Sequence, residues 1–67
     1  MKVGTIIKNM EKPCKIVLKR FHNDRPCYQK EKVHNSNYTF LFFASDKVLD
    51  CRKISDKHYE IICRGKC

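Results

Sequence analysis

Turn-forming residues are scarce in this sequence, which has two glycines, two prolines and no tryptophan. Loop-rich disulfide scaffolds need many turn residues, so the scarcity favours regular secondary structure. Long apolar runs are also missing: the longest, residues 40–44, is far short of the ~20 residues that span a bilayer. The first residues contain no extended apolar segment. We therefore expect neither a signal peptide nor a transmembrane segment.

Acidic residues are a further shortage: seven Asp and Glu stand against fifteen Lys and Arg, for a formal net charge of +8. The length allows one domain, residues 1–67, and excludes a separate cofactor domain or a barrel enzyme. A domain of this size buries only ~60% of the surface of its unfolded chain, so its stability is marginal without a staple, a metal or a partner.

One apolar stripe at helical spacing predicts a short N-terminal helix: Val3, Ile6, Ile7 and Met10. Pro13 ends this helix, because the residue before a proline disfavours helical dihedral angles. A strand over residues 3–8 is the competing interpretation, since β-branched residues are frequent there.

Apolar and polar residues alternate with period two along several segments, as in half-buried strands. In the first turn cluster, Asn23 and Asp24 can bond to their own backbone, and Pro26 fixes φ. The aromatic run at residues 38–43, which follows a second turn at 34–37, favours a central strand. The predicted strands are residues 14–21, 27–33, 38–43 and 59–63, with turns at 22–26, 34–37 and 55–57.

The segment after residue 44 allows two interpretations. Ser45 can cap a short helix, with Asp46 in its first turn. A strand over residues 48–54 agrees almost as well with the apolar residues there. Together the elements predict an α+β fold, a small single domain with about four antiparallel strands and one or two short helices; a small all-β open barrel is the alternative.

The five cysteines leave three interpretations open. In a secreted protein, four of them could form two disulfides and leave one thiol, and the glycosylation sequon at residues 37–39 fits secretion. Alternatively, several fill the core as small hydrophobic side chains. A metal site is the third interpretation, although no pair has the C-x-x-C spacing of a zinc ribbon. The cysteines are Cys14, Cys27, Cys51, Cys63 and Cys67.

The metal interpretation depends on a repeated spacing. Six residues separate Cys27 from His34, and six separate Cys51 from His58. Four such ligands suit tetrahedral zinc, but zinc knuckles place their paired ligands roughly two to four residues apart. The spacing therefore does not predict a knuckle, and we assign no metal and no other cofactor.

Basic residues concentrate in the N-terminal half, where residues 1–34 carry nine basic and three acidic side chains. Such a distribution is typical of a domain that binds nucleic acid or another polyanion. We expect Lys15 and Lys19 to share a strand face, with Lys30 and Lys32 near enough on the partner strand to join them. The predicted partner-binding residues are Lys8, Lys12, Lys15, Lys19, Arg20, Arg25, Lys30, Lys32 and Tyr38.

Aromatic residues alternate along the predicted strand at 38–43. If the face that carries Tyr38, Phe40 and Phe42 is open, these rings form a stacking platform for single-stranded bases beside the basic residues. A domain without tryptophan needs aromatic residues for its core, however, so we expect Phe40 and Phe42 to be buried.

The side-chain chemistry favours binding over catalysis. No phosphate loop, nucleophile elbow or paired-carboxylate motif is present, and nothing in the spacing brings His22, His34 and His58 together. The leading hypothesis is a non-enzymatic binding domain without a small-molecule substrate. Its partner is anionic, with nucleic acid first and an acidic protein surface second, and it binds through the basic N-terminal half.

Two other functions stay open. One is a secreted, cationic, disulfide-stabilised protein that acts as a toxin, defence peptide or effector. The other is a small intracellular inhibitor of a host enzyme. The location depends on the start of the chain: cytoplasmic if the chain is complete, secreted if Met1 is an added start.

Overall fold

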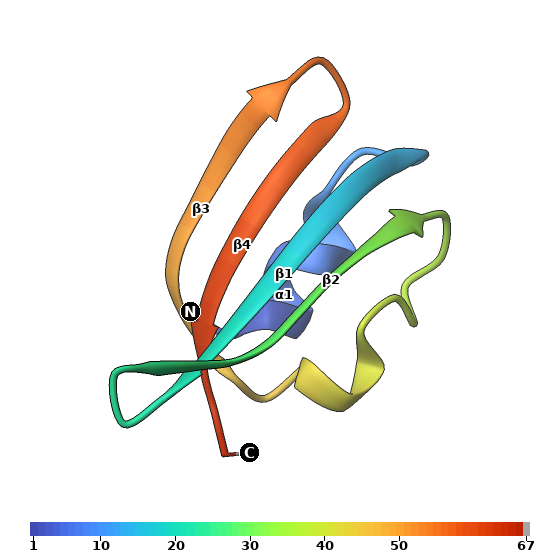
Figure 1. Ribbon diagram of the computed structural model, residues 1–67. Helices are drawn as coiled ribbons and strands as arrows, with labels where there is room; N and C mark the ends of the chain where they lie inside the picture. Colours follow the sequence, from blue (N-terminus) through green and yellow to red (C-terminus); the bar gives the residue numbers. More distant parts are fainter. Residues whose placement is uncertain (67) are drawn as a thin grey trace.

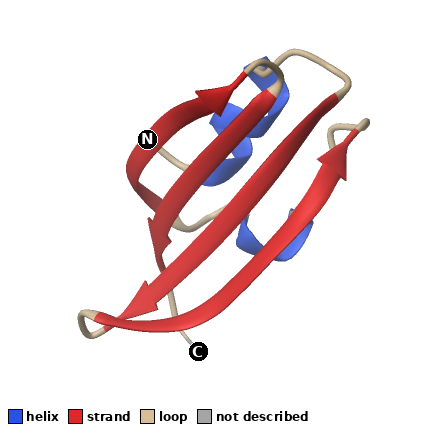
Figure 2. Cartoon of the chain, turned by 45° about the horizontal axis from the view of Figure 1, so that its top comes forward, coloured by secondary structure: helices blue, strands red, loops and turns tan. Residues whose placement is uncertain are grey.

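The computed structural model describes residues 1–66 and contains a four-stranded sheet, one short helix and one 3-10 turn (Figure 1). The elements are α1 (Val3–Asn9), β1 (Cys14–His22), β2 (Arg25–His34), η1 (Leu41–Phe43), β3 (Lys47–Ser55) and β4 (His58–Arg64). The strand order is β2-β1-β4-β3. Both α1 and η1 lie on one face of the sheet, called here the helix-side face, and the opposite face is open (Figure 2).

The sheet joins two hairpins through their inner strands. β1 pairs with β2 and β3 pairs with β4 in antiparallel register, whereas the central pair of β1 and β4 is parallel. The α+β class, the four strands and the short helix are confirmed, and the sheet does not close into the alternative barrel. The expectation of antiparallel pairing fails only at the centre, where the connection between the hairpins brings two strands of the same direction together.

Buried and less buried side chains alternate along β1, and the buried ones form the centre of the core. Cys14, Ile16 and Leu18 are buried on the helix-side face, as the period-two pattern predicted. Ile61 and Cys63 of β4 lie in the same layer. The buried apolar side chains are Val3, Ile7, Cys14, Ile16, Leu18, Phe40, Ile61 and Cys63.

Packing on the sheet holds α1 in place, because its seven residues are too few for a stable isolated helix. The predicted stripe is confirmed, since Val3 and Ile7 are buried. No side chain caps the first turn. Instead, the Val3 N–H donates to the Asp46 carbonyl oxygen (3.0 Å), and the Gly4 N–H donates to that of Ala44 (2.9 Å). A Cβ on Gly4 would lie 3.1 Å from the Ala44 Cβ, so the close approach favours glycine.

The predicted turn at residues 22–26 is confirmed as the tip of the first hairpin. Its two central residues, Asn23 and Asp24, have φ angles of 52° and 63°. Asn and Asp tolerate this left-handed conformation, and two such residues in succession match the right-handed twist of the flanking strands. The local sequence therefore sets the register of β1 and β2.

Residues 35–46 cross the helix-side face, and the strand predicted at 38–43 is wrong. β2 and β3 occupy opposite edges of the sheet, so this crossing segment has to pass over a face instead of pairing with an edge (Figure 2). It turns at Phe40, whose φ is 55°, and continues as η1. Aromatic residues favour strands only where they pair with a neighbouring strand, and a segment that crosses a face of the sheet makes no such pairing.

The strand interpretation of the next segment is correct, and the helix capped by Ser45 is wrong. β3 pairs with β4 across a tight turn at Asp56 and Lys57. A helix in place of β3 would leave the outer edge of β4 with unpaired backbone N–H and C=O groups. The strand predicted at 59–63 is confirmed as β4.

An ion pair fastens the end of the crossing segment to the sheet. Arg20 Nε and Nη2 of β1 donate to the two carboxylate oxygens of Asp46 at 2.7 and 2.8 Å. The two side chains are only 18% and 7% exposed. The Arg20 guanidinium also lies 4.6 Å from the centroid of the Phe43 ring. A Cβ on Gly65 would lie 2.5 Å from Arg20 Nε, so the pair leaves no room for a side chain there.

We expect Asp46→Ala to lower the free energy of unfolding by about 2–4 kcal/mol, because it leaves the partly buried Arg20 guanidinium unpaired. Asp50→Ala is the matched control. Asp50 and Arg52 are 3.8 Å apart and more than half exposed, and exposed pairs of this kind are worth only ~0–1 kcal/mol. Urea unfolding measures both variants. Equal losses would contradict the role assigned to Asp46.

Candidate polyanion-binding surface

A charge network around Glu60 occupies the open face. Its carboxylate accepts hydrogen bonds from Arg52 and lies 3.0 Å from Lys19 Nζ. Arg52 also approaches the Asp50 carboxylate at 3.8 Å. The hydrogen bond from Arg52, and then that from Lys19, holds the pKa of Glu60 below its usual 4.5 despite its burial. These charges largely neutralise one another.

A carboxylate whose pKa is depressed in the folded state stabilises the fold above its unfolded pKa, and this stabilisation is lost as the pH falls through the folded pKa. We therefore expect the thermal unfolding midpoint of the wild type to fall between about pH 5 and pH 2, and Glu60→Gln to show a smaller fall. Thermal unfolding followed by circular dichroism across this range measures the difference. Parallel pH profiles would show that Glu60 is not the responsible group.

The side-chain carboxylates of residues 1–66 lie away from the β2 half of the helix-side face. Glu31 of β2 faces the open side, where it is 3.0 Å from Nε2 of His58. Glu11 accepts a hydrogen bond from the Tyr59 hydroxyl at 2.8 Å, on the β4 side of α1. The others belong to the open-face network (Asp50, Glu60), the buried ion pair (Asp46) or the hairpin turns (Asp24, Asp56).

The crossing segment divides its apolar side chains between the core and the solvent. Phe40 is 3% exposed, and the Phe43 ring packs against that of Tyr28 on β2, with the centroids 4.7 Å apart. Three other apolar side chains of the segment are exposed: Tyr38 (74%), Leu41 (58%) and Phe42 (93%). The segment is thus anchored by two rings and presents a small apolar surface outward.

Two lysines of β2 border this surface on one side. Lys30 and Lys32 lie on the helix-side face, because the register places them opposite the buried residues Leu18 and Ile16. Lys32 Nζ is 5.2 Å from the centroid of the Phe40 ring, so this ammonium group directly adjoins the crossing segment.

Two further lysines border the surface on the side of α1. A hollow of about 280 Å³ separates α1 from the crossing segment. Lys2 and Lys8 line it together with the polar side chains of Asn37 and Thr39. No carboxylate of the described chain lines this hollow. The lysines and exposed apolar side chains form one surface, called here the loop patch: Lys2, Lys8, Lys30, Lys32, Tyr38, Leu41 and Phe42.

The loop patch brings together four of the predicted partner-binding residues and leaves five outside. The four are Lys8, Lys30, Lys32 and Tyr38.

Lys15 and Lys19 lie on the open face, so the expectation that they form one stripe with Lys30 and Lys32 is wrong. The register is the cause, since it aligns the lysines of β2 with the buried positions of β1. Arg20 is bound to Asp46, Arg25 follows the first hairpin turn, and Lys12 follows α1.

Three members of the loop patch are absent from the sequence-based set. Phe42 was expected in the core and is 93% exposed, whereas the burial expected for Phe40 is confirmed. The left-handed turn at Phe40 reverses the inward and outward order that a strand would give. No local signal distinguishes Leu41 as exposed, and Lys2 joins the patch only because α1 packs beside the crossing segment.

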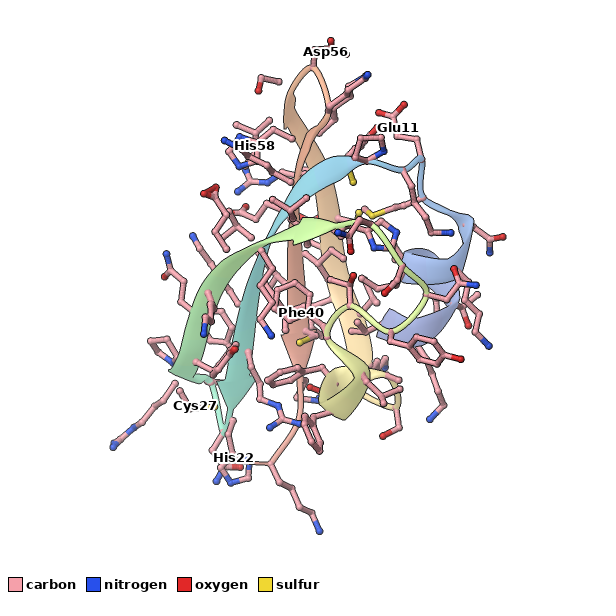
Figure 3. The ribbon with its side chains drawn as sticks, turned by 90° about the vertical axis from the view of Figure 1, so that its right-hand side faces the viewer. Glu11, His22, Cys27, Phe40, Asp56 and His58 are labelled. Carbon is pink, nitrogen blue, oxygen red and sulfur yellow. The ribbon has the colours of Figure 1, made fainter. Side chains whose placement is uncertain are left out.

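The repeated Cys-x6-His spacing does not assemble a site. Cys27 and His58 lie at opposite ends of the molecule (Figure 3). His34 is fully buried opposite Cys14, where burial and then the nearby Lys12 lower its pKa. Within residues 1–66, no group of three or more His, Cys, Asp or Glu side chains could hold a metal ion.

Three of the five cysteines are free thiols, namely Cys14, Cys51 and Cys63. At most one pair is left for a disulfide, so the arrangement with two disulfides is wrong. Cys14 and Cys63 are buried in the core, as the second interpretation predicted. Burial, with a hydrogen bond to Asp46, raises the pKa of Cys63 to about 12. Cys67 lies outside the described residues.

Alkylation without reductant should therefore modify at least three thiols per chain in denaturant, as read by intact mass. In native buffer we expect Cys51 to react first, because it is exposed on β3, and Cys14 and Cys63 to react only when the fold opens. Peptide mapping assigns the sites. Modification of fewer than three thiols in denaturant would contradict the structure.

No protein family, curated protein or solved structure matches the chain. Within the described residues, no helix is both long and apolar enough to cross a membrane. The function is therefore inferred from the geometry and charge of the loop patch.

Proposed function

We propose that the chain is a non-enzymatic binding domain that holds an anionic polymer, nucleic acid in the first place, on the loop patch. One observation carries this proposal: four lysines surround an exposed aromatic surface, and no described carboxylate lies among them. Cations gathered without counter-charges produce a positive potential that attracts phosphates. An acidic protein surface would be attracted by the same charges and is the second candidate.

Within residues 1–66 the lysines of the loop patch form no ion pair and are available to a partner, as are basic side chains elsewhere such as Lys15 and Lys57. Lys19, Arg20 and Arg52 are paired with carboxylates, whereas the lysines of the loop patch have no carboxylate partner within residues 1–66. An unpaired lysine releases condensed counterions when it meets a phosphate, and this release drives binding.

Salt dependence tests the proposal. The affinity for a labelled single-stranded oligonucleotide, measured by fluorescence anisotropy, should fall with salt with a log–log slope of about −3, from roughly 0.7 for each of four lysines. The double variant Lys30→Gln/Lys32→Gln should bring the slope to about −1.5 and weaken binding. Lys15→Gln/Lys57→Gln removes the same charge away from the loop patch and should leave the slope near that of the wild type. A flat salt dependence, or equal effects of both double variants, would refute the assignment.

A further inference from the structure

The outward side of the crossing segment carries two aromatic rings whose surfaces are largely open to solvent. The Phe42 side chain is 93% exposed and that of Tyr38 is 74% exposed. Exposed aromatic residues on a basic surface are typical of sites where unpaired bases stack, because every base has a flat π-face. Leu41, at 58% exposure, adds apolar contact area on the same segment.

Hydrogen bonds and packing hold the backbone that carries these rings in a defined position. The Tyr38 N–H donates to Ser36 Oγ at 3.2 Å, and the Leu41 N–H donates to the Tyr38 carbonyl oxygen at 3.1 Å. Phe40 and Phe43 anchor the segment to the core from below. A surface that is ordered before binding loses little conformational entropy when a ligand arrives.

The hollow beside the rings offers polar groups for base edges. Asn37 and Thr39 of the crossing segment and Thr5 of α1 line it, with lysines at its border. Amide and hydroxyl groups can bond to the donors and acceptors of an unpaired base, whereas in the acyl layer of a membrane they would lose their partners. These polar groups favour a nucleic acid strand over a lipid surface, while Ile7, Leu41 and Ala44 supply the apolar part of the lining.

We propose that the loop patch is selective for single-stranded nucleic acid, with unpaired bases stacked on Tyr38 and Phe42 and the phosphates held by the surrounding lysines. This inference depends on the proposed function, since it names the form of nucleic acid that the same surface accepts. In a duplex the faces of the bases are covered by their neighbours, so the rings cannot stack on them and only the lysine contacts remain.

Ring deletions test this selectivity. Phe42→Ala and Tyr38→Ala should each weaken binding of a single-stranded oligonucleotide by about fivefold or more. Both should leave the affinity for the matching duplex and the salt slope unchanged. Phe42→Trp should retain single-strand binding, because it keeps a π-face. Leu49→Ala removes a half-exposed apolar side chain from β3 and serves as the control, with no change expected. Circular dichroism confirms that each variant is folded.

The outcomes separate this inference from the proposed function. Unchanged single-strand affinity in both ring variants, with salt-dependent binding that is lost in Lys30→Gln/Lys32→Gln, would overturn base stacking and leave polyanion binding standing. Absence of salt-dependent binding to either form would overturn both. Vesicles with anionic headgroups provide the last comparison: binding that requires Phe42 on vesicles but not on oligonucleotides would assign the patch to lipid and overturn the inference.

Discussion

The carboxylate of Asp46 is the group on which the helix-side face depends. It binds the Arg20 guanidinium of β1 through two hydrogen bonds and accepts a weak one from the Cys63 thiol of β4. The backbone of the same residue accepts from the Val3 N–H, where α1 begins, and donates to the Phe43 carbonyl oxygen, where η1 ends. One residue thus joins the sheet, the helix and the crossing segment. Because the pair is partly buried, removing either partner leaves the charge of the other uncompensated.

The separation of charges between the two faces follows from the pleat of the sheet. Glu60 and its basic neighbours meet on the open face because they occupy alternate positions on adjacent strands. Lys30 and Lys32 occupy the alternate positions of β2, which face the helix side. No carboxylate of residues 1–66 lies opposite them in the register. Three of the seven acidic side chains, Glu31, Asp50 and Glu60, therefore lie on the open face. The fields of Lys2, Lys8, Lys30 and Lys32 add up beside the crossing segment.

Exposed apolar surface is a cost for so small a domain, and three of the large exposed side chains, Tyr38, Leu41 and Phe42, belong to the crossing segment. The crossing segment places Phe40 in the core and exposes Phe42 to solvent. The edge strands β2 and β3 are long, but charged side chains such as Glu31 and Arg52 discourage their pairing with other chains. The net charge of +8 acts in the same direction through repulsion between copies.

The sequence by itself determined the elements whose pattern is local. Period-two alternation identified β1 and β2, and the segment after the turn at 55–57 was correctly predicted as β4. The apolar stripe identified α1, and the residue types at Asn23 and Asp24 identified the hairpin turn. It also named part of the candidate surface, with Lys8, Lys30 and Tyr38 among the residues that meet there. Local patterns succeed in these cases because alternation and turn geometry are properties of neighbouring residues.

Only the tertiary structure decided where residues 35–46 run. The shape of the loop patch depends on this path. The aromatic run satisfies every local preference for a strand, but its flanking strands lie at opposite edges of the sheet. The segment must cross a face, and the left-handed turn at Phe40 then exposes Phe42. The register likewise decided that Lys30 lies with these rings and Lys19 does not. Both outcomes depend on which strands become neighbours, a long-range property that no short window of the sequence contains.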